Sequence, residues 1–151
     1  HQAGLGGANS TEFVSDCPDP VIALVTEWMT DDGLVEKRDD AVDVGGTMRL
    51  GAQECVLEDD SIVAGLYQTN NIFERHRHRS EFNSNYRNQL EEHQLTFSGF
   101  SKDGLAEMIE IKDHPWFIGC QFHPEFTSSP IRGHPLFQSF IKAAVEYSKK
   151  K

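Results

Sequence analysis

His123 and Glu125, within the stretch CQFHPEFTSSP, are the residues whose types and spacing point most directly to chemistry. In extended backbone, side chains two positions apart point to the same side, and Pro124 between them favours extended backbone. A carboxylate in contact with an imidazole can orient the ring as a general base. The pattern therefore predicts a base with an orienting acid. The alternative is a His-Pro turn whose glutamate is only solvated.

The three cysteines, Cys17, Cys55 and Cys120, are poor candidates for a nucleophile that this base could activate. Cys17 lies among acids and prolines, and nearby negative charge raises the pKa of a thiol. Cys55 falls within a predicted strand. Cys120 precedes His123 by three residues, so in extended backbone the two side chains face opposite ways, roughly 10 Å apart. Because no GxSxG elbow offers a serine, the sequence shows a base but no nucleophile.

The stretch ERHRHRS combines three arginines on one face of an extended chain with two histidines on the other (Arg75, Arg77 and Arg79; His76 and His78). The arginines could bind a carboxylate or a phosphate, and the histidines could be metal ligands, although no third ligand is evident. A solvated edge strand protected by charge is the other interpretation. The stretch DVGGTMRLG lacks the spacing of a phosphate-binding loop, which favours a turn leading into a strand.

Apolar and alternating stretches predict the elements that must position these residues. Strands are expected over residues 20–29, the later part of 44–58, 70–83, 95–101, 106–112 and 114–122, with a turn at 102–104 that makes a hairpin of two of them. Helices are expected over 59–67, 85–94 and 134–151, and an acidic surface turn or hairpin over 30–40. An Asp pair followed by Ser61 is the N-cap signature of the first of these helices. The last helix carries one apolar stripe: Leu136, Phe137, Phe140, Ile141, Ala144 and Val145. This mixture predicts an α/β domain with a mixed sheet.

Composition limits the classes of partner. The chain has 151 residues, enough for one domain, and a formal net charge of −10, which disfavours nucleic acid and anionic membranes as partners. No apolar run is long enough to span a membrane, and the first residues do not resemble a secretory signal. The odd number of widely spaced cysteines favours a reducing cytoplasm. Because no methionine stands at position 1, we expect a chain that is processed, excised or incomplete.

Five stretches together resemble one family. CQFHPEFTSSP followed by GHPLFQSFIKAA resembles the end of a class I glutamine amidotransferase domain. ANSTEF, GGTMRLGAQ and ERHRHR narrow the resemblance to the glutaminase domain of CTP synthases, over Gly7 to about Tyr147. The resemblance implies a mixed, mostly parallel sheet flanked by helices, with an added β-hairpin. It also implies that L-glutamine is hydrolysed by a Cys-His-Glu triad. The ammonia then passes to a synthase domain, which uses ATP and Mg²⁺ to aminate UTP.

The resemblance assigns roles to four residues. His123 would be the triad base and Glu125 the acid that fixes its tautomer. Glu12 would meet the α-ammonium group of glutamine, and Arg79 its α-carboxylate. Ser80 departs from the family, which usually has an aromatic residue there, so packing near the substrate is expected to differ. No residue of this chain is assigned to a metal.

In the family, the nucleophile elbow lies upstream of the position of His1. Residues 1–151 are therefore expected to be the C-terminal part of a single glutaminase domain, inactive and marginally stable alone. The complete enzyme would be a cytoplasmic homo-oligomer, a tetramer, activated by GTP, with Arg49 as a candidate contributor to the nucleotide response. The alternatives are a non-catalytic glutamine-pocket or interaction module, or another class I amidotransferase or a glutamyl hydrolase.

Overall fold

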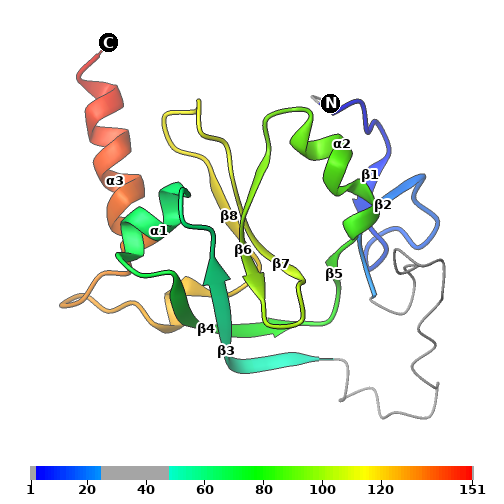
Figure 1. The fold of residues 1–151 in the computed structure, drawn as a ribbon, viewed down its shortest axis with the longest axis horizontal. Helices are drawn as coiled ribbons and strands as arrows, with labels where there is room; N and C mark the ends of the chain where they lie inside the picture. The colour runs from blue at the N-terminus through cyan, green and yellow to red at the C-terminus, as the bar shows by residue number, and fades with distance from the viewer. Residues whose placement is uncertain (1–2, 25–47, 151) are drawn as a thin grey trace. The chain divides into compact units, whose positions relative to one another are not determined.

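The computed structural model describes residues 3–24 and 48–150 (Figure 1). The chain divides into two compact units, one formed by His1–Arg49 with His78–His93 and the other by Leu50–Arg77 with Gln94–Lys151. The acidic turn predicted over 30–40, the Gly-Gly turn and the end of the first predicted strand lie outside the described residues.

The first unit contains a three-stranded sheet of order β1-β2-β5, formed by Ala8–Ser10, Asp19–Ala23 and Glu81–Phe82. β1 and β2 run parallel, and β5 runs antiparallel to β2. A short 3-10 helix, η2 (Ser84–Tyr86), and α2 (Arg87–Glu91) follow β5. The side chain of Asn83 begins this turn, since it accepts a hydrogen bond from the Asn85 N–H at 3.1 Å. These elements confirm a strand beginning near Pro20 and a short helix within 85–94.

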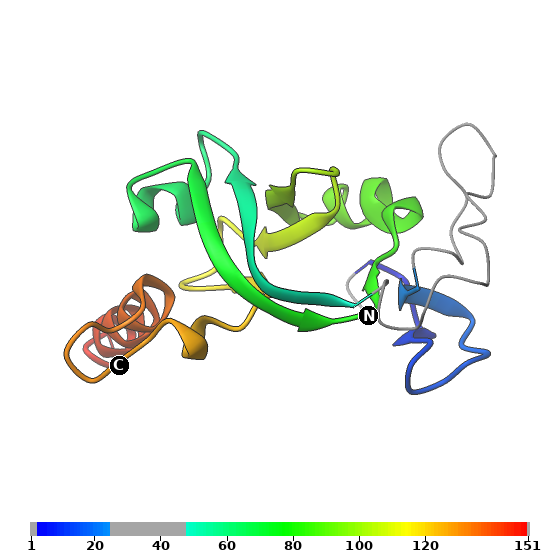
Figure 2. The same ribbon diagram turned by 90° about the horizontal axis from the view of Figure 1, so that it is seen from below.

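The second unit is built on a five-stranded sheet of order β4-β3-β6-β7-β8. Its strands are Arg49–Leu57 (β3), Asn71–His78 (β4), Thr96–Ser101 (β6), Ala106–Glu110 (β7) and Ile118–Cys120 (β8). β6 and β7 form the predicted antiparallel hairpin, and Gly104 in its turn has a φ of 80°, a conformation that favours glycine. β3 and β4 are the long curved strands of Figure 2, and β4 lies at one edge of the sheet.

The mixed α/β architecture is confirmed, but the balance of strand directions differs from the expected mostly parallel sheet. Among the strand pairs described, β1–β2 is parallel, whereas β2–β5, β3–β6, β6–β7 and β7–β8 are antiparallel. A parallel pair needs a crossover of a dozen or more residues, and the links between β6, β7 and β8 are shorter than that. Strand β8 is also shorter and less buried than predicted, because it lies at the sheet edge and pairs with β7.

Helix α1 (Ile62–Tyr67) begins at Ser61, as predicted, and has a second cap that the sequence did not indicate. The Ser61 hydroxyl accepts a hydrogen bond from the Ala64 N–H at 3.1 Å. The buried Glu110 carboxylate of β7 accepts bonds from Ile62 N–H at 3.0 Å and Val63 N–H at 3.3 Å. The apolar core of this unit consists of Cys55, Leu57, Val63, Ala64, Ile72, Met108, Phe122 and Leu136.

Helix α3 (Pro135–Ser148) confirms the last predicted helix, but its apolar stripe is exposed over most of its length. Leu136 is buried, whereas Phe137, Phe140, Ile141 and Val145 are 42 to 60% exposed. Among the described residues, Leu136 in the first turn joins the core cluster of the unit, and α3 lies next to α1 (Figure 1). Among the described helices, none combines the length and apolarity needed to cross a membrane.

Candidate functional site

His123 and Glu125 are brought together by a tight turn and not by extended backbone. After β8 the chain forms the 3-10 helix η3, Pro124–Phe126, with Pro124 at its first position. The Phe126 N–H donates to the His123 carbonyl at 3.1 Å, and the Thr127 N–H donates to the Pro124 carbonyl at 3.3 Å. The expectation of an extended His-Pro-Glu segment is therefore wrong. The proline favours this turn because its fixed φ suits the first helical position.

The expected contact between the two side chains is nevertheless present. His123 Nδ1 lies 2.7 Å from Glu125 Oε1, and the side chains are 37% and 54% exposed. The hydrogen bond from His123 lowers the pKa of Glu125, so this carboxylate is ionised at neutral pH. Nδ1 must then carry the proton, which leaves Nε2 as the acceptor of the neutral ring. The Phe126 ring stacks on the imidazole with 5.1 Å between ring centroids.

The thiols of Cys55 and Cys120 have the environment of structural cysteines, as expected. The Cys120 thiol donates to the Phe122 carbonyl at 3.5 Å and does not reach toward His123. Burial, reinforced by nearby carboxylates, raises the pKa of both Cys55 and Cys120 to about 12. Cys17 is buried in the first unit. Since a thiolate is the reactive form, Cys55 and Cys120 are inert at neutral pH.

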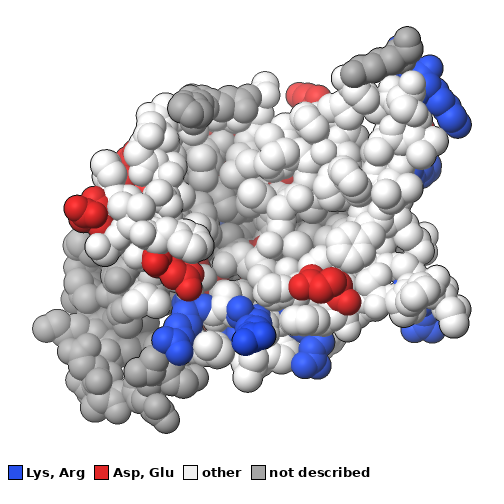
Figure 3. All heavy atoms as spheres, turned by 180° about the vertical axis from the view of Figure 1, so that it is seen from behind, with Lys and Arg blue, Asp and Glu red and all other residues white. Residues whose placement is uncertain are grey.

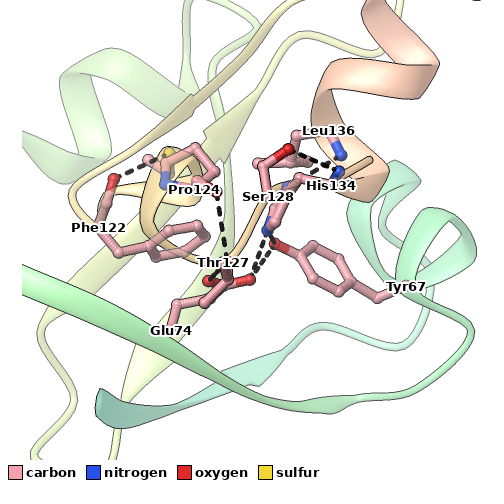
Figure 4. A network of polar contacts seen from close by, with 9 residues as sticks. Tyr67, Glu74, Phe122, Pro124, Thr127, Ser128, His134 and Leu136 are labelled. Carbon is pink, nitrogen blue, oxygen red and sulfur yellow. Dashed lines mark hydrogen bonds and ion pairs between the residues drawn. The ribbon is translucent and has the colours of Figure 1, made fainter. Parts of the chain in front are cut away.

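A buried polar network surrounds the carboxylate of Glu74 on β4 (Figure 4). Its Oε1 lies 2.7 Å from His134 Nε2 and 2.9 Å from the Tyr67 hydroxyl, and its Oε2 lies 3.0 Å from the Thr127 hydroxyl. The network connects β4, α1, the end of η3 and the start of α3. Sequence analysis missed it because its members are scattered along the chain. The one available signal was His134 before Pro135, a polar residue at a helix start.

Arg75 and Arg77 lie on the edge strand β4, and Arg79 follows the last residue of that strand. Arg75, Arg77 and Arg79 are exposed, while His76 is buried with its Nδ1 3.5 Å from Glu107 Oε2. This alternation confirms the predicted two faces. The position of β4 at the sheet edge supports the interpretation of an edge protected by charge. On the face drawn in Figure 3, basic side chains form small groups with acidic side chains nearby.

The two residues expected to bind glutamine, Glu12 and Arg79, belong to the first unit and are both exposed. The Glu12 N–H donates to the Ser10 hydroxyl at 3.2 Å, which fixes the backbone there. His123 and Glu125 belong to the second unit. The structure thus brings His123 and Glu125 into contact, while the catalytic roles of these two residues and the binding roles of Glu12 and Arg79 stay predictions.

Arg49, the candidate for a nucleotide response, contacts a buried carboxylate. Its Nε lies 2.6 Å from Glu81 Oε1, and His78 Nε2 lies 3.1 Å from the same oxygen. Because Glu81 is almost fully buried, this ion pair gives Arg49 a structural role within the first unit. The predicted nucleotide role is not tested by this contact.

Comparison with known proteins defines the class. The family model for glutamine amidotransferase class-I matches residues 14–143, and the chain therefore belongs to that family.

Among solved structures, the chain resembles the Trypanosoma brucei CTPS glutaminase domain with bound acivicin, with a TM-score of 0.77 and 30% identity. That match covers 95% of this chain and 53% of the other. A putative GMP synthase subunit from Thermoplasma acidophilum matches with a TM-score of 0.52 and 20% identity over 68% of this chain and 47% of the other, which shows the fold alone. The chain spans about half the length of these two structures, and the first match supports the resemblance seen in the sequence.

Proposed function

We propose that this chain carries the general base of glutamine hydrolysis within the glutaminase domain of a CTP synthase. The observation that carries the proposal is the 2.7 Å contact between His123 Nδ1 and Glu125 Oε1 at the end of η3. Family membership supplies the reaction class, and the match to the Trypanosoma brucei glutaminase domain supports the narrower assignment.

In this proposal, His123 Nε2 takes the proton of a cysteine thiol as the sulfur attacks the carboxamide carbon of glutamine. The imidazolium that forms is stabilised by Glu125 and gives its proton to the departing ammonia. Water then hydrolyses the thioester, with His123 again as the base, and glutamate leaves. Burial raises the pKa of both Cys55 and Cys120 to about 12, which argues against either as the nucleophile. In this proposal the attacking thiol is supplied by a residue outside these 151.

Glu12 and Arg79 would select the substrate. A carboxylate can pair with the α-ammonium group of glutamine, and a guanidinium can bind its α-carboxylate with two parallel hydrogen bonds. Both side chains are exposed and therefore accessible to a ligand. Their loss should raise KM for glutamine more than it lowers kcat, because these contacts are made with the substrate and the transition state alike.

The complete enzyme would pass the ammonia to a synthase domain that aminates UTP with ATP and Mg²⁺. By the same resemblance, it would be a cytoplasmic homotetramer activated by GTP. Nucleic acid and membranes are not among its proposed partners.

A comparison of glutamate release tests the proposal. The 151-residue chain alone should show no enzymatic turnover of L-glutamine, whereas a longer protein that supplies the cysteine should hydrolyse it. Ordinary turnover by the chain alone would overturn the assignment of the nucleophile. Failure of the longer protein to hydrolyse glutamine would favour a non-catalytic binding module.

A further inference from the structure

The turn that carries the proposed dyad is attached to β4 at both of its ends. At its start, the His123 N–H donates to the Arg75 carbonyl at 2.8 Å. At its end, the Thr127 hydroxyl donates to Glu74 Oε2 at 3.0 Å. Glu74 and Arg75 are consecutive residues, so a single point on β4 fixes a turn of five residues. The His123–Glu125 contact lies between the two attachments.

The Glu74 carboxylate is itself held in place from two other elements (Figure 4). His134 Nδ1 accepts a hydrogen bond from the Leu136 N–H at 3.3 Å, so the proton of the neutral ring is on Nε2, which donates to Glu74 Oε1. The Tyr67 hydroxyl donates to the same oxygen. Burial and the adjacent Glu74 charge raise the pKa of Tyr67, so its phenol remains a donor.

The Glu74 carboxyl group is ionised, so both of its oxygens accept hydrogen bonds and neither donates one. Burial alone would raise the pKa of Glu74, but the hydrogen bonds from His134, Tyr67 and Thr127 outweigh burial and leave this pKa below its ordinary value. An ionised carboxylate accepts hydrogen bonds and donates none. With Oε1 occupied by His134 and Tyr67, Oε2 is the oxygen that meets the Thr127 hydroxyl.

We infer that Glu74 and Thr127 are positioning residues for the proposed base. Their hydrogen bond fixes the far end of the η3 turn, and this keeps Glu125 against His123 Nδ1 and leaves Nε2 as the proton acceptor. The inference rests on the proposed role of His123 in glutamine hydrolysis. Residues that hold a functional side chain through hydrogen bonds determine its tautomer and how accurately it is positioned.

The test is the tautomer of His123, measured by ¹⁵N NMR of the imidazole nitrogens in the 151-residue chain. The original chain should show His123 with its proton on Nδ1. Thr127→Val removes the hydroxyl at an exposed position and keeps the side-chain shape, so it should shift His123 toward the Nε2–H form. Thr127→Ser should restore the original signals. Thr127→Ala carries the same prediction as Thr127→Val if the valine variant does not fold.

Tyr67→Phe is the matched control, because it removes another hydrogen bond to the same carboxylate without touching the turn. It should lower stability and leave the His123 tautomer unchanged. Equal shifts in the Tyr67→Phe and Thr127→Val variants would show a general structural effect and overturn the inference. An unchanged His123 tautomer in the folded Thr127→Val or Thr127→Ala variant would overturn it as well.

A kinetic measurement in the longer protein separates this inference from the proposed function. Thr127→Val should lower kcat for glutamine hydrolysis about tenfold and leave KM unchanged. The expected loss is smaller than the full contribution of a general base, because His123 is still present but less well positioned. If His123→Ala keeps its activity, the proposed function fails while the NMR result still decides the positioning role. If His123→Ala is inactive but Thr127→Val keeps both its rate and the Nδ1–H tautomer, the positioning role fails alone.

Discussion

Two histidine–glutamate pairs in the same unit have the same nitrogen–oxygen distance and different consequences. His123–Glu125 and His134–Glu74 are both 2.7 Å apart. The first pair joins residues two positions apart, is exposed, and uses Nδ1, which leaves Nε2 as the acceptor of the neutral ring. The second joins residues 60 apart, is buried, and uses Nε2, while Nδ1 caps α3. The two pairs therefore differ in burial and in the ring atom that meets the carboxylate, and only the exposed pair has an imidazole nitrogen that the proposed function can use as a base.

Removing the buried pair should have the largest effect on stability. His134→Ala deletes both a hydrogen bond to a buried charge and the cap of α3, so it should lower the free energy of unfolding by about 3 kcal/mol. Glu125→Ala, in the exposed pair, should leave that free energy unchanged. Urea unfolding of the two variants checks the contrast, and equal losses would contradict the division into a structural and a functional pair.

Removing the charge of the exposed pair should instead affect catalysis. In the longer protein, Glu125→Gln should lower kcat for glutamine hydrolysis about 10²-fold, because the imidazolium loses its stabilising carboxylate. The same substitution at the exposed Glu146 on α3 serves as the control and should change nothing. Steady-state kinetics would count against the dyad if both variants matched the unsubstituted enzyme.

Acid should weaken the fold through the buried pair. Because the pKa of Glu74 is lower in the folded chain than in the unfolded chain, its ionisation adds stability above the unfolded value of about 4.3. That stability is lost as the pH falls through the lower, folded value. The free energy of unfolding, measured between pH 7 and pH 3, should therefore fall more steeply with decreasing pH for the original chain than for Glu74→Gln. Parallel curves would show that Glu74 is not stabilised as an anion.

Substitutions at the thiols should have the smallest effect on glutamine hydrolysis. With a pKa of about 12, Cys120 has a thiolate fraction of about 10⁻⁴ at pH 8, so iodoacetamide should modify it about 10³-fold more slowly in the folded chain than in urea. Cys120→Ser should leave glutamine hydrolysis by the longer protein unchanged. Fast modification of Cys120 in the folded chain, or loss of glutamine hydrolysis in Cys120→Ser, would contradict this account and make Cys120 a candidate nucleophile.

The sequence anticipated the exposed pair because its members are neighbours, and two residues two positions apart can meet in several backbone conformations. That is why the contact was predicted correctly from the wrong, extended geometry. The alternation along β4 and the Ser61 cap were predicted for the same local reason.

The buried pair could not be predicted, because Glu74, Tyr67, Thr127 and His134 meet only through the packing of four elements. The exposure of the α3 stripe was missed for a related reason. Apolar periodicity shows which face of a helix favours burial but not how far its neighbours extend along it.

The most direct test of the proposed base is His123→Ala in the longer protein, with product formation measured separately from glutamine and from added ammonia. The account predicts that the glutamine-dependent rate falls by about 10³-fold or more, since the base is lost, while the ammonia-dependent rate is retained. A glutamine-dependent rate equal to that of the unsubstituted enzyme would contradict the account.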